Sequence, residues 1–433
     1  MKGTLKVSNF LIVNHAELEL NDITIIIGPQ ANGKSIIAKL VYYFNAISDD
    51  FLEGIRTQAG KRELDSNLIE RFENYFPRYA WDGSSFDIAF SCDDININIH
   101  GEAGNNGRTK LKINYCDSLV RFYRSRKQGF KKILDELDPE ASGYLRYKVS
   151  ERGLFREFSH QLNGDDEFSG FFNEAAFIPA SRSFFANLQR NIFTFLASNI
   201  DIDPFLKEFG GVYEFSKSFY RSSFSKKHRN SSSNVARIER YISDVVRGSY
   251  EYIDEKDWIV SKSHRINVAN ASSGQQEALP MLLTMLTWPR RSKGKGSRLF
   301  VEEPEAHLFP TAQSKVVAIL SNLNVKYSTG FFITTHSPYV LSAVNSLIMA
   351  HDAISSGHVD KSDFQNKFDL GEPLNFDNIS AYTINKGNLV SIRDEEYRII
   401  GAEILDNVAE TLDEATSYLL ERTPLSQNDE EES

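Results

Sequence analysis

A glycine-rich motif between a buried strand and a helix constrains this chain more than any other feature of its sequence. The residues Ile23–Ile27 form a run without a polar face, which is typical of a strand covered on both sides. Residues 28–35, GPQANGKS, match the phosphate-loop pattern GxxxxGK(S/T). Apolar residues then recur at helical spacing over residues 35–44. This order of strand, glycine loop and helix predicts an α/β fold with an anion site at a strand end.

Phosphate chemistry accounts for the residue types in this loop. Backbone N–H groups of the loop and the positive end of the following helix would converge on phosphate oxygens. The ammonium group of Lys34 would reach the β and γ phosphates, and the hydroxyl of Ser35 would bind Mg²⁺. We therefore expect eight residues to bind a nucleotide: Gly28, Pro29, Gln30, Ala31, Asn32, Gly33, Lys34 and Ser35.

A second apolar segment ends in adjacent carboxylates. Residues 299–301 are followed by Glu302 and Glu303 and then by the sequence PEAHLFP. We expect this strand end to lie beside the phosphate loop, where Glu302 would hold Mg²⁺ through water and Glu303 would polarise the attacking water. An acidic cluster after a short strand is otherwise more often a solvated turn or a helix cap. The phosphate loop in the same chain favours the catalytic interpretation.

Two further segments place polar groups where they can contact a nucleotide. Ser272, Ser273, Gly274 and Gln275 form a turn that opens a helix and presents hydroxyl groups, N–H groups and the positive helix end to an anion. His336 follows an apolar strand that would deliver it to the same sheet edge. Taken alone, the turn is an ordinary helix cap and the histidine is a structural residue.

The composition is that of an ordinary soluble globular protein. The 433 residues are 41% hydrophobic and 25% charged, with a formal net charge of −10, so any nucleic-acid contact requires a local basic patch. The longest apolar stretches are of strand length, and the first residues lack the apolar region of a secretory signal. Cys92 and Cys116 lack the close-spaced partners that zinc sites need. We expect a cytoplasmic protein that does not contact a membrane.

The remaining pattern indicates one discontinuous head with an insertion. Alternating segments between residues 86 and 115 predict an antiparallel meander, and helical spacing follows over residues 118–137. Residues 258–261 and 266–268 predict two strands, and residues 395–420 a C-terminal helix. We therefore divide the chain into a head of residues 1–117 and 250–350, a mainly helical insertion of residues 118–249, a C-terminal extension of residues 351–426 that packs on the head, and an acidic tail of residues 427–433.

The order of the four motifs resembles the ABC-type ATPase heads of the SMC, RecF and OLD-like group. The phosphate loop is similar to Walker A, residues 272–276 to the signature motif, residues 299–303 to Walker B, and His336 to the catalytic switch histidine. Residues 5–20 resemble the first strands of RecF-like heads. The resemblance implies an α/β fold class, an ABC-type P-loop ATPase head with an antiparallel β lobe, a mixed core sheet and a helical insertion. It also implies ATP and Mg²⁺ as cofactors.

The same resemblance implies a homo-oligomer with composite sites. In that group two heads sandwich ATP, so Ser273 of one subunit would cap the γ-phosphate bound by Lys34 of the other. Glu302 stands where Walker B usually has aspartate, a form familiar from the OLD-like branch. Arg182, at the end of the segment FIPASR, resembles an arginine of that branch that lies near the nucleotide pocket. A purely structural role for Arg182 is an equal alternative.

ATPase subunits of this kind are typical of bacterial anti-phage systems such as Septu, PARIS and certain retrons, in which a homo-oligomeric ATPase controls a separate effector. The interval between Lys34 and Ser273 is too short for a long coiled-coil arm, and we expect no nuclease domain after His336. The resemblance thus implies an ATP-driven switch that senses infection and controls an effector such as a nuclease. Two alternatives stay open: a RecF- or SMC-like ATPase of DNA repair or chromosome maintenance, and a scaffold in which ATP is structural.

Residues 108–132 contain nine basic residues interleaved with aromatic ones. Such a pattern is suited to a nucleic-acid backbone, as is the sequence KKHR at residues 226–229. The alternative is a solvated helix face paired with neighbouring acids such as Asp135. The basic residues of this cluster are Arg108, Lys110, Lys112, Arg121, Arg124, Arg126, Lys127, Lys131 and Lys132.

Overall fold

The computed structural model describes residues 3–135, 171, 174–186, 202–224, 233–254, 256–291 and 296–401. Three segments singled out in the sequence lie wholly or mostly outside the described residues: the basic residues 226–229, the C-terminal helix of residues 395–420 and the acidic tail of residues 427–433. The proposed insertion of residues 118–249 is described only in part.

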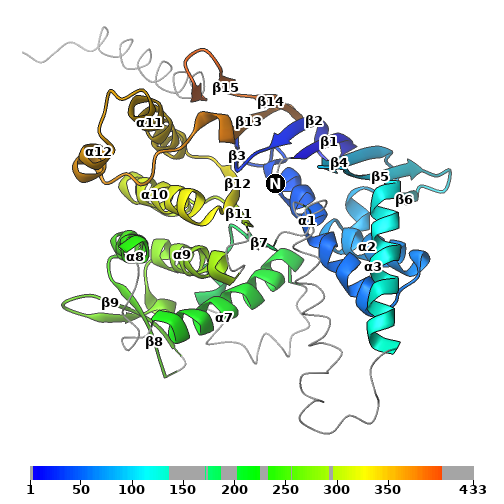
Figure 1. Ribbon diagram of the computed structural model, residues 1–433, viewed down its shortest axis with the longest axis horizontal. Helices are drawn as coiled ribbons and strands as arrows, with labels where there is room; N and C mark the ends of the chain where they lie inside the picture. The colour runs from blue at the N-terminus through cyan, green and yellow to red at the C-terminus, as the bar shows by residue number, and fades with distance from the viewer. Residues whose placement is uncertain are drawn as a thin grey trace, which may run out of the picture.

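One large mixed sheet organises the described part of the chain (Figure 1). Its eleven strands have the order β6-β5-β4-β1-β2-β14-β13-β3-β12-β11-β7. The first five strands pair in antiparallel fashion and the last five in parallel, so the sheet has two lobes that meet at β14. The strands are β1 (Gly3–Phe10), β2 (Val13–Leu20), β3 (Ile23–Ile27), β4 (Phe86–Cys92), β5 (Ile95–Ala103), β6 (Thr109–Tyr115), β7 (Glu174–Ile178), β11 (Ser297–Glu302), β12 (Gly330–Thr335), β13 (Ile379–Asn385) and β14 (Asn388–Ser391).

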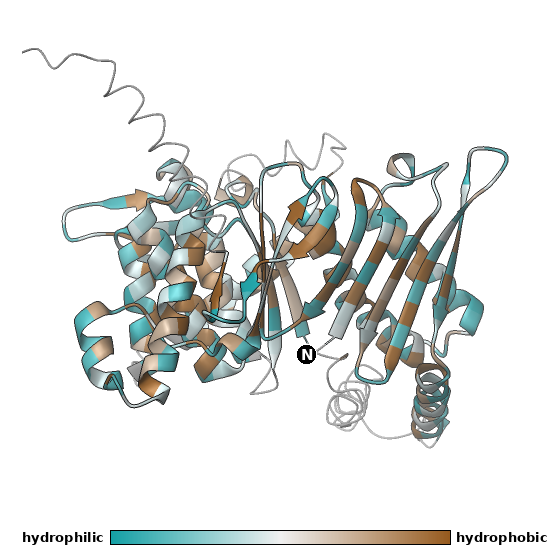
Figure 2. Ribbon diagram, turned by 90° about the horizontal axis from the view of Figure 1, so that it is seen from above, coloured by the Kyte–Doolittle hydropathy of each residue, from teal (hydrophilic) through white to brown (hydrophobic). Residues whose placement is uncertain are grey.

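The antiparallel lobe follows from alternating side chains. In β4 every second residue is buried, namely Phe86, Ile88, Phe90 and Cys92, whereas the residues between them are more exposed. Figure 2 shows the same alternation as hydrophobic and hydrophilic bands across these strands. β4, β5 and β6 form consecutive hairpins, which confirms the meander predicted between residues 86 and 115.

The parallel lobe is covered by helices on both faces. All of β3 is buried, and its side chains alternate between two hydrophobic cores: Ile26 lies in one, and Ile25 and Ile27 in the other. The first core contains α1 to α3 and the second α8 to α11, which lie on opposite sides of the sheet in Figure 1. These helices are α1 (Lys34–Arg56), α2 (Lys61–Tyr75), α3 (Asp117–Asp135), α8 (Ser233–Val246), α9 (Ser273–Arg291), α10 (Pro310–Tyr327) and α11 (Pro338–Ser355).

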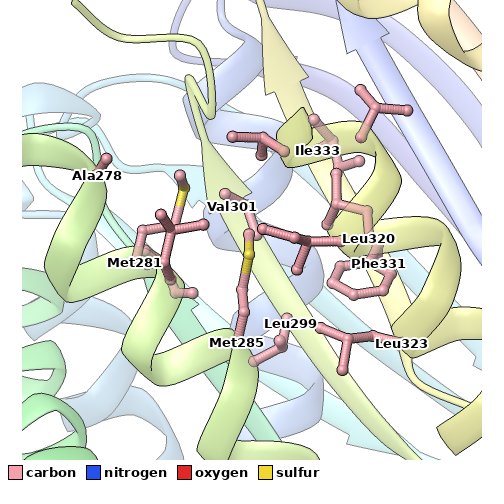
Figure 3. Packing of buried hydrophobic residues seen from close by; sticks show 14 of the residues in the cluster. Ala278, Met281, Met285, Leu299, Val301, Leu320, Leu323, Phe331 and Ile333 are labelled. Atoms are coloured by element: carbon pink, nitrogen blue, oxygen red, sulfur yellow. The ribbon is translucent and has the colours of Figure 1, made fainter. Parts of the chain in front are cut away.

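Helix α9 is fixed to the parallel lobe by apolar packing (Figure 3). Its residues Ala278, Met281 and Met285 point toward Leu299 and Val301 of β11. All five side chains are fully or almost fully buried. Burial of an apolar side chain of this size stabilises a fold by roughly 1.5–3 kcal/mol. The helix that begins at the predicted signature turn is therefore held firmly against the strand that carries the predicted carboxylates.

The C-terminal region contributes strands as well as helices. β13 and β14 lie inside the main sheet, so residues 379–391 are part of the head sheet. The expected helix of residues 395–420 is wrong at its start, because Asp394 accepts hydrogen bonds from the N–H groups of Glu396 and Tyr397 and closes a turn. A short hairpin of β15 (Arg393–Asp394) and β16 (Ile399–Ile400) results.

The region assigned to a mainly helical insertion contains one strand of the head. β7 pairs in parallel with β11 at the sheet edge, whereas α3, α7 (Pro204–Phe224) and α8 are helical as expected. The two strands predicted at residues 258–261 and 266–268 correspond to β9 (Lys256–Val260) and β10 (Arg265–Asn267), which form a small sheet with β8 (Ser249–Ile253). The domain limits stay a prediction.

Candidate nucleotide-binding site

The register of the parallel strands brings the predicted site residues to one edge of the sheet. Ile27 of β3 pairs with Thr335 of β12, and Glu302 of β11 pairs with Thr334. The phosphate loop, Glu302 and His336 therefore leave the sheet at the same level. This is the carboxyl edge of parallel strands, where open α/β sheets bind their ligands.

The strand order corrects one expectation. We expected the strand that ends in Glu302 to lie beside the phosphate loop, and this is wrong, because β12 lies between β3 and β11. The immediate neighbour of the loop is therefore His336, which follows β12 directly. The carboxylates lie one strand further away, and Glu303 is connected to Lys34 of the loop by way of His336, which contacts both residues.

Left-handed backbone angles shape the loop. The angle φ is +154° at Gly28, +60° at Ala31 and +96° at Gly33. A Cβ atom on Gly33 would lie 3.1 Å from a methyl carbon of Val13, so the turn between β1 and β2 packs directly against the start of α1. Because α1 begins at Lys34, its unpaired N–H groups lie at the carboxyl edge of the sheet.

The ammonium group of Lys34 is folded onto its own loop. Its Nζ atom donates hydrogen bonds to the carbonyl oxygens of Gly28 at 2.7 Å and Pro29 at 2.6 Å and lies 3.3 Å from Nδ1 of His336. Burial lowers the pKa of Lys34, and the carboxylate of Glu303 opposes this shift. A buried cation held only by carbonyls and a histidine fits an arriving phosphate, which offers it full negative charges.

His336 connects Lys34 to Glu303. Its Nε2 atom lies 3.0 Å from Oε1 of Glu303. An ammonium group has only donors, so Nδ1 of His336 must accept from Lys34, and the ring proton is then assigned to Nε2, which donates to Glu303. A neutral imidazole with this tautomer satisfies both contacts.

The remaining carboxylates line the same edge. Glu302 is almost fully buried, and its Oε1 atom has no hydrogen-bond partner among the described residues. Glu305 accepts hydrogen bonds from Oγ1 of Thr335 at 2.8 Å and from the backbone N–H of His336 at 2.6 Å. An unpartnered buried carboxylate oxygen and the hydroxyl of Ser35 are oxygen donors of the kind that Mg²⁺ prefers. The donor set therefore fits a magnesium ion.

Arg182 holds the segment that carries the carboxylates. Its guanidinium group is fully buried and donates to the backbone carbonyls of Glu302 at 2.6 Å and Glu303 at 3.0 Å. It also donates to the carbonyl of Pro179 at 3.0 Å and, across to α9, to that of Glu277 at 3.1 Å. Arg182 thus ties the end of β11 to the helix that begins at the signature-like turn.

The signature-like turn stands apart from the phosphate loop. Ser272 and Gln275 bond to each other in the manner of a capping box, and Ser272 and Ser273 are exposed. A Cβ atom on Gly274 would lie 2.7 Å from the carbonyl oxygen of His307, so only glycine allows this approach. Among the described residues, no hydrogen bond joins this turn to the phosphate loop.

The structure thus brings the predicted residues together in two groups. The phosphate loop, Glu302, Glu303 and His336 form the first, and the turn of residues 272–275 forms the second. The positions of Thr335 and Glu305 were not assigned from the sequence. Thr335 directly precedes His336, and Glu305 lies in the same PEAH sequence as the predicted carboxylates, so proximity in the chain was the available signal.

One family model matches part of the chain. Residues 181–341 match the family model described as AAA ATPase domain. The matched range includes Glu302, Glu303 and His336 and begins after the phosphate loop. On this match the chain is an ATPase. None of the curated proteins compared with the chain matches it.

Solved structures from the SMC and RecF groups are similar to the chain. The SmcHead bound to the C-winged helix domain of ScpA has 12% identity and a TM-score of 0.38, covering 91% of this chain and 98% of that chain. The SMC head domain from Thermotoga maritima has 12% identity and a TM-score of 0.36, covering 91% and 99%. The recombination mediator protein RecF has 12% identity and a TM-score of 0.30, covering 90% and 98%.

The helices of the described residues were also compared with the requirements of a bilayer. None of them combines the length and the apolar character needed to cross a membrane.

Proposed function

We propose that the chain hydrolyses ATP with Mg²⁺ at composite sites between two heads and that it is the switch subunit of a bacterial anti-phage defence complex. The observation that carries this proposal is the division of the site. Lys34, His336 and Glu303 form one connected group, whereas Ser273 starts an exposed helix end without a hydrogen bond to that group. A second copy of the chain, facing the first, would supply the missing half of each site.

The residues of one head would bind the nucleotide and prepare the water. The loop of residues 28–35 would surround the phosphates, and Lys34 would exchange its two carbonyl contacts for phosphate oxygens. Mg²⁺, when bound by Ser35 and Glu302, would neutralise phosphate charge. Glu303 would accept the proton of the attacking water, and the neutral imidazole of His336 would hold that carboxylate in place.

The other head would complete the site. Ser272, Ser273, Gly274 and Gln275 would present hydroxyl groups, N–H groups and the positive end of α9 to the γ-phosphate. Arg182 joins α9 to the segment of Glu302. A contact at the signature-like turn of one head would therefore change the position of that head's own carboxylates.

Subunit mixing tests the composite site. Lys34→Ala removes one half of the site and Ser273→Arg blocks the other, so each variant alone should be inactive. Mixed in equal amounts, they should recover part of the wild-type ATPase activity, because some mixed pairs contain one intact site. Inactivity at every ratio, with mixed assembly proven by mass spectrometry, would favour a site within one subunit.

The defence role rests on the resemblance to ATPases of anti-phage systems and on the compact head. It requires a separate effector, and genes adjacent to this one are the first candidates. A bacterial host that carries the locus should plate phage less efficiently than a host with the Glu303→Gln variant. If the two hosts plate a broad phage panel equally, the defence role is wrong even if the ATPase is active.

One observation favours the RecF- or SMC-like alternative. Helix α3 carries several basic side chains, which suits a protein that contacts DNA. Loss of resistance to DNA damage on deletion of the gene, without an effect on phage plating, would support this second function.

A further inference from the structure

A cavity of about 510 Å³ lies at the far end of α1 from the phosphate loop. Its walls come from the end of α1, the start of α2, the end of β6 and one face of α3, which stand together beside the antiparallel lobe in Figure 1. Its volume falls within the range of roughly 300–1,000 Å³ that is usual for small-molecule sites. The lining residues that matter here are Lys61, Tyr115, Arg124, Lys127, Gln128 and Lys131.

Four of these residues are cations, and no carboxylate belongs to the lining among the described residues. Lys127 donates to the carbonyl oxygen of Ala59 at 2.7 Å, and Lys61 lies over the ring of Tyr115. Within the described part of the chain, none of the four cations has an acidic side chain within ion-pair distance. Four positive groups around one cavity repel each other unless an anion lies between them.

The walls also offer groups that suit a flat polar ring. Tyr115 is half-buried beside the cavity. Its hydroxyl donates a hydrogen bond to the carboxylate of Asp65, and this bond fixes the orientation of the ring. Tyr123 is held by its hydroxyl bond of 2.9 Å to Ala59. The exposed amide of Gln128 has both a donor and an acceptor for the edge of a base. Cations beside fixed tyrosines and an amide match a phosphate joined to a nucleobase.

We propose that this cavity binds one nucleotide unit, by its phosphate at Arg124, Lys127 and Lys131 and by its base beside Tyr115. The unit can come from a free mononucleotide or from the unpaired end of a nucleic-acid strand. The assignment divides the basic cluster of residues 108–132, because Lys110 and Lys112 lie on β6 outside the cavity lining.

Its position makes the cavity suited to regulation, a step that rests on the proposed ATPase switch. The 23 residues of α1 span about 35 Å, with Lys34 at one end and the cavity residues Phe51 and Ala59 at or beyond the other. α1 is largely buried along this length, so it moves as one body with the sheet. A ligand in the cavity and a nucleotide in the loop therefore act on the same element, and each changes the affinity of the other by the same factor.

Direct binding to the full chain tests the cavity without ATP hydrolysis. The Lys34→Ala background removes the phosphate-loop site, and the probes are AMP, measured by calorimetry, and a 5′-phosphorylated, 3′-labelled oligothymidylate, measured by anisotropy. Arg124→Ala with Lys131→Ala should weaken binding of the cognate probe at least about tenfold, since two charge-assisted contacts are lost. The matched control, Lys110→Ala with Lys112→Ala, should keep affinity within about twofold.

The outcomes separate the sources and the failures. Tight binding of AMP supports a free nucleotide, and binding of the oligonucleotide alone supports a strand end. The cavity assignment is overturned if neither probe binds with a dissociation constant below about 1 mM. It is also overturned if the Lys110→Ala, Lys112→Ala variant weakens binding as much as the Arg124→Ala, Lys131→Ala variant. All four exposed side chains can be removed without opening the core, and equal melting temperatures will establish this. The ATPase activity of the wild-type protein and the mixing of Lys34→Ala with Ser273→Arg subunits are scored separately, so failure of the cavity assignment does not affect the proposed function.

Discussion

Glu303 and His336 are joined by a hydrogen bond of 3.0 Å although they follow two different strands. The bond fixes the carboxylate at the height of the phosphate loop, and the other nitrogen of the ring faces the ammonium group of Lys34. Lysine, histidine and glutamate thus form one chain of contacts across β3, β12 and β11. Movement of Lys34 toward a phosphate would leave His336 with one partner, so nucleotide binding and the position of Glu303 are linked.

Lys34→Ala should abolish nucleotide binding. The loop N–H groups remain, but the charge that faces the β and γ phosphates is lost, so ATP affinity should fall at least about 100-fold. Titration with a fluorescent ATP analogue measures this. Lys39→Ala, on the same helix and paired with Asp203, is the control and should bind like the wild type. Micromolar affinity retained in Lys34→Ala would contradict the assignment of the loop.

Glu303→Gln should bind ATP and hydrolyse it at least about 100-fold more slowly, because an amide cannot accept the proton of water. The closed head pair should then accumulate, which size-exclusion chromatography with ATP detects. Turnover close to that of the wild type would exclude Glu303 as the base.

The variant Glu305→Gln tests whether Glu305 positions its neighbours by hydrogen bonds or accepts the proton of the attacking water. Glu305 accepts from Thr335 and from the backbone of His336, and an amide oxygen can still accept these two bonds. We expect a loss of less than about tenfold in turnover. A loss as large as that of Glu303→Gln would move the role of the base to Glu305.

Arg182→Met should destabilise the protein strongly. The four hydrogen bonds that the buried guanidinium donates to backbone carbonyl groups would be lost, together with its charge beside the carboxylate of Glu277, which costs about 3 kcal/mol or more. Urea unfolding measures the free energy. The control Arg265→Met removes an exposed arginine that lies over Trp258 and should change it by no more than about 1 kcal/mol. If both variants changed the free energy of unfolding equally, the buried hydrogen bonds of Arg182 would contribute no more to stability than an exposed arginine does.

Asp369 links α8 to α10 and should make stability depend on acid pH. It accepts from Arg240 at 2.6 Å, Tyr241 at 2.7 Å and Lys315 at 3.0 Å. Burial raises the pKa of Asp369, but the hydrogen bonds of Tyr241 and Lys315 outweigh it, so the pKa lies below its usual 3.8. The ionised group therefore stabilises the folded state above that usual value, and this contribution is lost as pH falls through the lowered pKa.

The variant Asp369→Asn should lower the free energy of unfolding by about 1 kcal/mol at pH 7, and its difference from the wild type should shrink below about pH 4. Asparagine keeps the left-handed backbone at this position, where φ is +48°. Asp254→Asn, in a turn with φ of +51°, is the matched control. A difference that stays constant down to pH 3 would contradict the role of the charge.

The separate elements of the site could be predicted from short segments of the sequence, but their arrangement in the sheet could not. The phosphate loop, the carboxylates and His336 each follow an apolar strand, so each could be predicted from a short segment. The order of β3, β12 and β11 depends on pairing between distant segments, which alternation does not encode. The contact of Arg182 with Glu277 joins residues 95 positions apart, and no spacing rule reaches so far.

The start of the predicted C-terminal helix was wrong for a different reason. The apolar residues near Ile399 and Ile400 fit a helical period. The side chain of Asp394 instead accepts hydrogen bonds from the backbone N–H groups that follow it, so a turn forms in place of a helix. The backbone of Ile400 is then secured by two bonds to the side chain of Asn345, at 2.9 Å each. Tertiary partners of this kind decide between two local patterns that the sequence leaves equally open.

The position of β3 between β12 and β13 has a consequence for the synthesis of the protein. The strand that feeds the phosphate loop is made early, yet its two neighbours are Gly330–Thr335 and Ile379–Asn385. Until the ribosome has released these segments, both edges of β3 carry free N–H and C=O groups. A chain cut short before Ile379 lacks β13, one of the two strands that flank β3, so the strand that leads into the phosphate loop would keep one edge without a partner.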